Sequence, residues 1–244
     1  MLKSNFESES LPCAILRIPF TIREKALTPI WPVPPVPHRV RPPHLRRHPA
    51  HVTLRAQRLL PSLRGDRVFS VLRGGLALGT RGGLRILEFS VQRDHLHLIV
   101  EADDGPALSR GIQGLAIRLA KAVNRAVGRR GRVWGDRYHL RALKTPREVR
   151  DALVYVLQNW RKHMPGFRGL DPCSSALWFR GWRRVVPTEA ARSPVAAPRT
   201  WLAAVGWRRL GLIGDDEAPI TRRSGSGPSQ ITKPLAERAR QQLR

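Results

Sequence analysis

The sequence predicts an α+β fold in which one antiparallel sheet and its helices form a single ordered domain. Two β-rich runs, at residues 85–92 and 95–101, are separated only by Arg93 and Asp94, which is typical of a β-hairpin. Two amphipathic patterns with capping residues at their starts follow the hairpin. Hydrophobic residues make up 41% of the 244 residues, enough for one core, whereas 21 Pro and 20 Gly indicate that part of the chain is loop or tail.

The elements before the hairpin are a strand and a helix. Residues 51–55, with the sequence His-Val-Thr-Leu-Arg, have the composition of a short strand. Residues 66–78 are compatible with a helix, although Gly74 and Gly75 weaken that prediction.

A longer helix is predicted after the hairpin. Asp104 can cap its N-terminus, and Pro106 lies in the first turn, where Pro is favoured. Its apolar stripe consists of Leu108, Ile112, Leu115, Leu119 and Val123. The Gly-Arg-Arg-Gly sequence at residues 128–131 ends this helix, and residues 133–143 indicate a loop with a short strand.

The last predicted helix begins with a capping box. Thr145 and Glu148 have the required spacing, and Pro146 occupies the first helical position. Its apolar stripe consists of Val149, Leu153, Val156 and Trp160. Pro165 and Gly166 end the ordered core.

This order of elements predicts a ferredoxin-like (RRM-like) split βαβ sandwich with the helices on one face of the sheet. We expect the ordered domain to span residues 46–165. Residues 1–45 form a Pro-rich basic leader, and residues 221–244 form a basic tail, both of which we expect to be disordered. Between them, residues 166–220 contain several Trp and are expected to pack as a C-terminal appendage.

The net charge indicates a polyanionic partner. The chain has 44 Lys and Arg against 18 Asp and Glu, a formal charge of +26. Each phosphate that such a protein neutralises releases counterions, so nucleic acid is the obvious ligand. The excess of Arg over Lys is explained equally well by phosphate binding and by a GC-rich gene, and the total charge is therefore the stronger argument.

Membrane insertion and disulfide bonding are both disfavoured. The apolar run at residues 11–20 is broken by Pro12, Arg17 and Pro19, which is incompatible with a signal peptide or a membrane span. The two cysteines lie far apart and form no Cys-x-x-Cys pattern. We expect a cytoplasmic protein.

Two histidines provide a candidate metal site. His95 and His97 are two apart on a predicted strand, so they project from the same face with Cα atoms roughly 6.6 Å apart. Two imidazoles on one face can share a metal ion. A pair of surface histidines on a polar sheet face would show the same spacing, and both interpretations stay open at this point.

A tyrosine lies off the apolar stripe of the last helix. Tyr155 falls in a polar sector, and Asn159 follows it at i+4, where both can reach one ligand or metal. The alternative is an amphipathic surface tyrosine that covers a neighbouring apolar edge.

These side chains can form one active site. A tyrosine hydroxyl has a pKa of about 10, so it attacks a phosphodiester only if the phosphate is polarised. A divalent ion held by His95, His97 and the amide oxygen of Asn159 would act as that Lewis acid and ease departure of the 3′ oxygen. His139 is a candidate spare ligand or phosphate contact, and Glu101 a minor ligand on the same strand face.

The His-x-His strand followed by a Tyr155-x-x-x-Asn159 helix resembles the single-tyrosine HUH transposases, especially the REP-associated tyrosine transposases and the insertion-sequence 200-like group. The resemblance covers roughly residues 48–163. It implies that His95, His97 and Asn159 hold Mg²⁺ or Mn²⁺ and that Tyr155 forms a 5′-phosphotyrosine link to single-stranded DNA.

The resemblance also implies a DNA partner in single-stranded or hairpin form and a nucleoid-associated location when DNA is bound. Members of the family act as monomers or as dimers, so a homodimer is possible. We expect basic residues of the second helix and the domain end to line the DNA path. These residues are Arg110, Arg118, Lys121, Arg125 and Lys162.

Other functions remain open. Relaxases are disfavoured because their tyrosine precedes the histidines, whereas HUH replication initiators keep the order seen here but have Tyr-x-x-Lys, and this chain has Gln158 in the lysine position. REP-associated members usually follow the Asn with Pro, and this chain has Trp160. A non-catalytic single-stranded nucleic-acid binder is the main alternative, and a zinc hydrolase lacks a third ligand at a fixed spacing.

Overall fold

The computed structural model describes residues 43–162, 169–184 and 192–219. The expected tail, and the expected leader apart from residues 43–45, lie outside the described residues. None of the described helices is both long enough and apolar enough to cross a membrane.

Four antiparallel strands form one sheet in the order β2-β3-β1-β4. They are β1 (Ala50–Arg55), β2 (Leu84–Val91), β3 (His95–Ala102) and β4 (His139–Ala142). Because β3 lies between β1 and β2, the sheet has the split βαβ arrangement of the ferredoxin-like fold, and the predicted fold class is confirmed.

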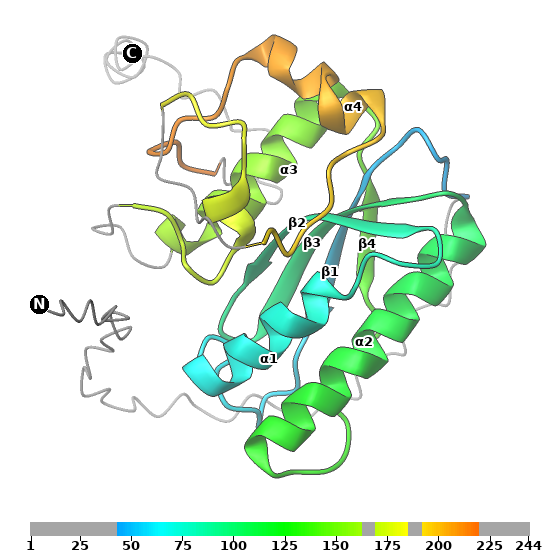
Figure 1. Cartoon of the computed structure of the whole chain (residues 1–244), viewed down its shortest axis with the longest axis vertical. Helices are drawn as coiled ribbons and strands as arrows, with labels where there is room; N and C mark the ends of the chain where they lie inside the picture. The colour runs from blue at the N-terminus through cyan, green and yellow to red at the C-terminus, as the bar shows by residue number, and fades with distance from the viewer. Residues whose placement is uncertain (1–42, 163–168, 185–191, 220–244) are drawn as a thin grey trace, which may run out of the picture.

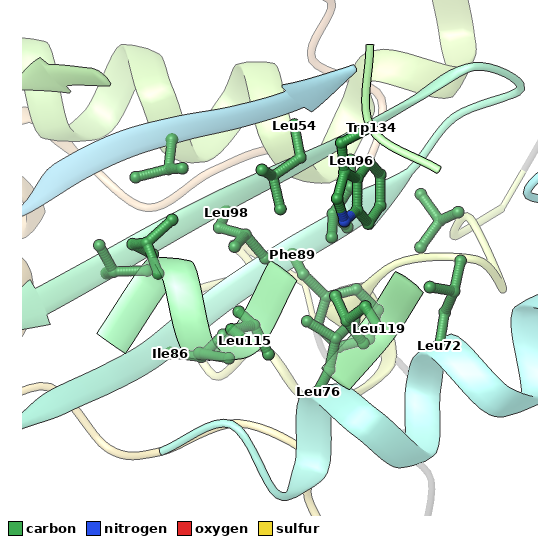
Figure 2. Packing of buried hydrophobic residues seen from close by; sticks show 14 of the residues in the cluster. Leu54, Leu72, Leu76, Ile86, Phe89, Leu96, Leu98, Leu115, Leu119 and Trp134 are labelled. Carbon is green, nitrogen blue, oxygen red and sulfur yellow. The ribbon is translucent and has the colours of Figure 1, made fainter. Parts of the chain in front are cut away.

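Helices α1 (Asp66–Ala77) and α2 (Gly105–Val127) cover one face of this sheet (Figure 1). Leu96 and Leu98 of β3 lie in one hydrophobic cluster with Leu115 and Leu119 of α2 (Figure 2). Gly75, one of the two glycines that weakened the prediction of α1, has a packing role, because a Cβ at this position would lie 2.5 Å from the Leu119 side chain. Gly75 therefore lets the two helices approach closely.

The predicted helix caps form as expected. The Asp104 carboxylate accepts a 2.6 Å hydrogen bond from Ala107 N at the start of α2, and Gly128 ends this helix with φ 67°. At the start of α3 (Pro146–Gln158), Thr145 and Glu148 form both hydrogen bonds of the capping box.

Helix α3 lies on the opposite face of the sheet from α1 and α2 (Figure 1). The expectation that one face carries the helices is therefore correct for α1 and α2 and wrong for α3. Leu87 and Ile99 point to this second face, and α3 buries them together with its own stripe. A sheet whose central strands are apolar on both sides needs cover on both sides.

The C-terminal segment packs against α3 and completes this second core. Its short helices are the 3₁₀ turn η1 (Asn159–Lys162), η2 (Ser175–Trp178), α4 (Trp201–Ala204) and η3 (Gly206–Leu210). Trp207 is 1% exposed in the same cluster as Ile99 and Val149. Arg150 of α3 binds both carboxylate oxygens of Glu217 at 2.6 and 2.9 Å, which ties the end of the described chain to the helix.

A buried carboxyl on β2 makes stability depend on pH. Glu88 accepts a 2.5 Å hydrogen bond from Ser175 Oγ, and burial raises its pKa from 4.5 to about 8. Between these values the folded state holds a proton that the unfolded state releases, so the free energy of unfolding falls as pH rises, by up to about 1.4 kcal/mol per pH unit.

Urea unfolding from pH 5 to 8 measures this dependence. Glu88→Gln keeps a neutral hydrogen-bonding group that does not titrate. We therefore expect the free energy of unfolding of the variant to fall less steeply with pH than that of the parent. Equal slopes in parent and variant would show that Glu88 does not titrate in this range.

Candidate active site

Strand β3 directs its two histidines to the face that carries α3. Leu96 and Leu98 belong to the core under α1 and α2, whereas His95 and His97 alternate with them. The two imidazole centroids lie 4.6 Å apart with the rings nearly perpendicular. His97 is only 4% exposed, which argues against a pair of ordinary surface histidines.

Helix α3 brings Tyr155 onto these histidines. Its ring centroid lies 5.1 Å from that of His97, with an interplanar angle of 81°. The tyrosine also packs at the margin of the second core, so its ring is half-buried. Burial raises the pKa of the Tyr155 hydroxyl above its usual value of 10, so the hydroxyl is a neutral phenol at pH 7.

Both histidines are held through their Nδ1 atoms. The Nδ1–H of His95 donates a 2.7 Å hydrogen bond to the Asp94 carboxylate. His97 Nδ1 lies 3.1 Å from both His51 Nε2 and Thr53 Oγ1. Such contacts fix the orientation of an imidazole and direct metal ligation to Nε2.

Sequence reasoning missed His51. Its ring centroid lies 5.1 Å from that of His97 and 5.7 Å from that of Tyr155. Burial, and then the positive charges of His139 and Arg141, lower the pKa of His51 to about 4, so it is neutral at pH 7. The predicted topology could have indicated His51, because a ferredoxin-like fold pairs β1 with β3. This pairing places Thr53 opposite His97.

Asn159 caps the C-terminus of α3, one turn beyond Tyr155. It is 2% exposed, and its Nδ2 atom is buried without a hydrogen-bond partner among the residues that the structure describes. A buried amide of this kind fits a role in ligand binding. Its convergence with the two histidines on one ion remains a prediction.

These residues fit a metal site that is completed by an amide and by substrate oxygens. Within residues 43–162, 169–184 and 192–219, no three His, Cys, Asp or Glu side chains are arranged to hold a metal ion. Oxygen donors from Asn159, phosphate and water suit Mg²⁺ or Mn²⁺.

Two further candidates lie on the same face of the sheet. Glu101 is 3% exposed, and its carboxylate accepts hydrogen bonds of 2.8 to 3.1 Å from the backbone N–H groups of Arg199 and Thr200. The suggested ligand role of Glu101 is therefore wrong, since the C-terminal segment occupies this carboxylate. His139 is exposed on β4 opposite Thr53, where a phosphate can reach it.

The basic residues predicted to line the DNA path do not gather at the histidines. Arg110, Arg118, Lys121 and Arg125 are all on α2, which covers the other face of the sheet. The side chain of Lys162 lies outside the described part of the chain. DNA binding by these residues stays a prediction.

A buried ion pair holds the turn that contains Asn159. Arg64 donates to both carboxylate oxygens of Asp171 at 2.7 and 3.0 Å and to Val91 O at 2.9 Å. Its guanidinium lies 3.7 Å from the ring centroid of Trp160, the residue after Asn159. Arg64 thus links the end of β2, the C-terminal segment and η1.

Asp171→Ala is expected to reduce the free energy of unfolding by roughly 3–5 kcal/mol, because it leaves the Arg64 charge buried without its partner. The Arg64 and Asp171 side chains are only 13% and 2% exposed. The Arg55–Asp94 pair, with side chains 77% and 50% exposed, is the matched control. Arg55→Ala should cost about 1 kcal/mol or less, and similar losses in urea unfolding for both variants would contradict this account.

Comparison with known proteins finds similarity to transposases. The sequence profile described as "Transposase IS200 like" matches residues 70–159, a region that includes both histidines of β3 and Tyr155. Comparison with curated protein sequences gives no match. A solved structure titled "Structure of the REP associates tyrosine transposase bound to a REP hairpin" is 19% identical, with a TM-score of 0.42, and the similarity covers 52% of this chain and 74% of that chain. Over these 90 of its 244 residues, the chain is similar to IS200-like transposases.

Proposed function

We propose that this protein cleaves and rejoins single-stranded DNA, with Tyr155 as the nucleophile and Mg²⁺ or Mn²⁺ as cofactor. The observation that carries the proposal is the contact between Tyr155 and His97, whose ring centroids lie 5.1 Å apart beside His95. A tyrosine at the edge of a histidine pair has the components of a phosphodiester cleavage site.

Each side chain has a defined part in the proposed reaction. The Tyr155 oxygen attacks the phosphorus, the bond from phosphorus to O3′ breaks, and the 5′ phosphate becomes esterified to the tyrosine. The phenol loses its proton, and the departing O3′ gains one. A metal ion held by His95, His97 and Asn159 would neutralise charge on the scissile phosphate during this step.

Residues around the histidines keep this arrangement rigid. Asp94 orients His95, whereas His51 and Thr53 orient His97. Because burial raises the pKa of Tyr155, the attack depends on activation of the phosphate more than on a preformed phenolate. The site is thus organised for a reaction that depends on a bound metal.

The covalent link explains why a transposase would use tyrosine rather than water. A phosphotyrosine ester conserves the phosphodiester bond, so a free 3′ hydroxyl can later attack it and restore a continuous strand. Hydrolysis would give a 5′ phosphate that cannot be rejoined without an energy source. The proposed function is therefore strand transfer rather than degradation.

Detection of the adduct tests this proposal. Single-stranded oligonucleotides that cover both strands of the DNA flanking the coding sequence, each labelled at its 3′ end, are incubated with the full chain and Mn²⁺. We expect a labelled protein band that survives denaturant and is absent with a chelator or with fully duplex DNA. If these oligonucleotides bind but never form an adduct with Mg²⁺ or Mn²⁺, the non-catalytic single-stranded DNA binder becomes the better description.

A further inference from the structure

A groove lies on the face of the sheet that carries the histidines. Its volume is about 690 Å³, and its walls come from the segment before β1, the end of β3 and the start of α4. Glu101, which lines the groove, lies four residues beyond His97 on β3 and on the same side of the strand. At about 3.3 Å per residue, this places the groove roughly 13 Å from the histidine cluster.

Helix α3 also extends from the groove to the histidine cluster. Lys144, which lines the groove, lies just before its N-terminus at Pro146, whereas Tyr155 is near its C-terminus. The groove and the tyrosine therefore lie near opposite ends of one helix on one side of the sheet. A DNA strand of a few nucleotides can extend from one to the other.

The groove carries an excess of positive charge. Arg47, Lys144 and Arg199 are exposed on its walls, and none of them has an ion-pair partner among the residues described. Two carboxylates also line the groove, and each already has a basic partner: Glu101 pairs with Arg85 at 3.8 Å and Asp103 with Arg46 at 4.0 Å. Burial, and then Arg47 and Lys144, lower the pKa of the adjacent His48, as expected in a positive field.

An aromatic side chain also lines the groove. Trp201, the first residue of α4, is 49% exposed. Arg209 lies 5.0 Å from the centroid of its ring, which holds the indole in place. Exposed indoles beside cationic side chains stack on unpaired bases, whereas paired bases in a duplex offer no such face.

We propose that this groove binds the single-stranded DNA that adjoins the cleaved phosphate, with its phosphates on Arg47, Lys144 and Arg199 and one unpaired base on Trp201. The proposal rests on the proposed function for its ligand and extends it to a second contact surface. It also differs from the prediction that the basic residues of α2 form the DNA path.

Two triple variants with equal charge changes separate these surfaces. The groove variant carries Arg47→Ala, Lys144→Ala and Arg199→Ala; the α2 variant carries Arg110→Ala, Lys121→Ala and Arg125→Ala. All six residues are exposed. Binding of a fluorescent dT20 oligonucleotide to the full chain is measured by anisotropy at several salt concentrations, with a chelator present so that no cleavage occurs.

We expect the groove variant to lose about two units from the slope of log affinity against log salt, since each phosphate contact on a single strand contributes about 0.7. The α2 variant tests the competing assignment: a slope equal to that of the parent supports the groove, whereas a loss of slope supports the α2 residues as the DNA path. Trp201→Leu should weaken binding roughly ten-fold and Trp201→Phe much less, because Phe retains a stacking face. Circular dichroism and thermal unfolding establish that each variant is folded.

The outcomes distinguish this inference from the proposed function. If the α2 variant loses the salt slope and the groove variant does not, or if the parent does not bind dT20, the groove assignment is overturned. If the parent binds duplex DNA as tightly as dT20, and Trp201→Leu does not change that affinity, the assignment to a single strand is overturned. Failure to form an adduct while the groove variant behaves as expected would remove the catalytic proposal and leave the binding surface standing.

Discussion

Replacement of Tyr155 by Phe is expected to abolish the covalent protein–DNA adduct while leaving DNA binding unchanged. The substitution removes only the hydroxyl group, and the ring that packs against His97 and the second core is retained. No other oxygen would then stand in this position to attack the phosphorus. The measurement is the yield of denaturant-resistant adduct, together with anisotropy for binding.

Tyr138 provides an internal control, because the chain has only these two tyrosines. It packs against the first core, the one covered by α1 and α2, and lies outside the histidine cluster. Tyr138→Phe should therefore form adduct at the rate of the parent. Adduct formation by Tyr155→Phe at the parental rate would show that the nucleophile is assigned wrongly.

His97→Ala is expected to reduce adduct formation roughly a hundred-fold or more, since a Lewis acid contributes several kcal/mol to stabilisation of the transition state. The same variant should bind Mn²⁺ more weakly in calorimetry, a readout that is independent of cleavage. A chelator should reproduce the loss of activity in the parent protein.

His44 supplies the matched control for this substitution. Its Nε2 atom lies 3.1 Å from Ala102 O at the end of β3, whereas His97 is buried within the cluster. His44→Ala should retain Mn²⁺ affinity. Unchanged Mn²⁺ affinity in a folded His97→Ala variant would contradict the ligand role of His97.

Much of the fold follows from local rules that act within one element. The alternation of polar and apolar residues at 95–101 predicted which face of the sheet carries His97. The capping pair of Thr145 and Glu148 predicted where α3 begins. Tyr155 was recognisable because it lies outside the apolar stripe of its helix. These features depend on the periods of strands and helices, which a sequence displays directly.

The features that sequence reasoning missed depend on contacts between distant segments. Nothing local shows that α3 crosses to the second face, because its stripe fits either side of the sheet. His51 lacks a distinguishing local pattern and joins the site only because β1 pairs with β3. Glu101 had the correct face for a ligand, but residues almost a hundred positions later along the chain bind its carboxylate.

The identity of the residue that is bonded to DNA tests the central proposal most directly. Trypsin cleavage after Arg150 and Arg161 releases Tyr155 in a peptide of residues 151–161, and cleavage after Arg137 and Arg141 releases Tyr138 in a separate peptide. Mass spectrometry of the nuclease-treated adduct should find a 5′-phosphorylated nucleotide on the peptide of residues 151–161. A nucleotide on any other peptide, or an adduct that carries a 3′ phosphate, would contradict the account.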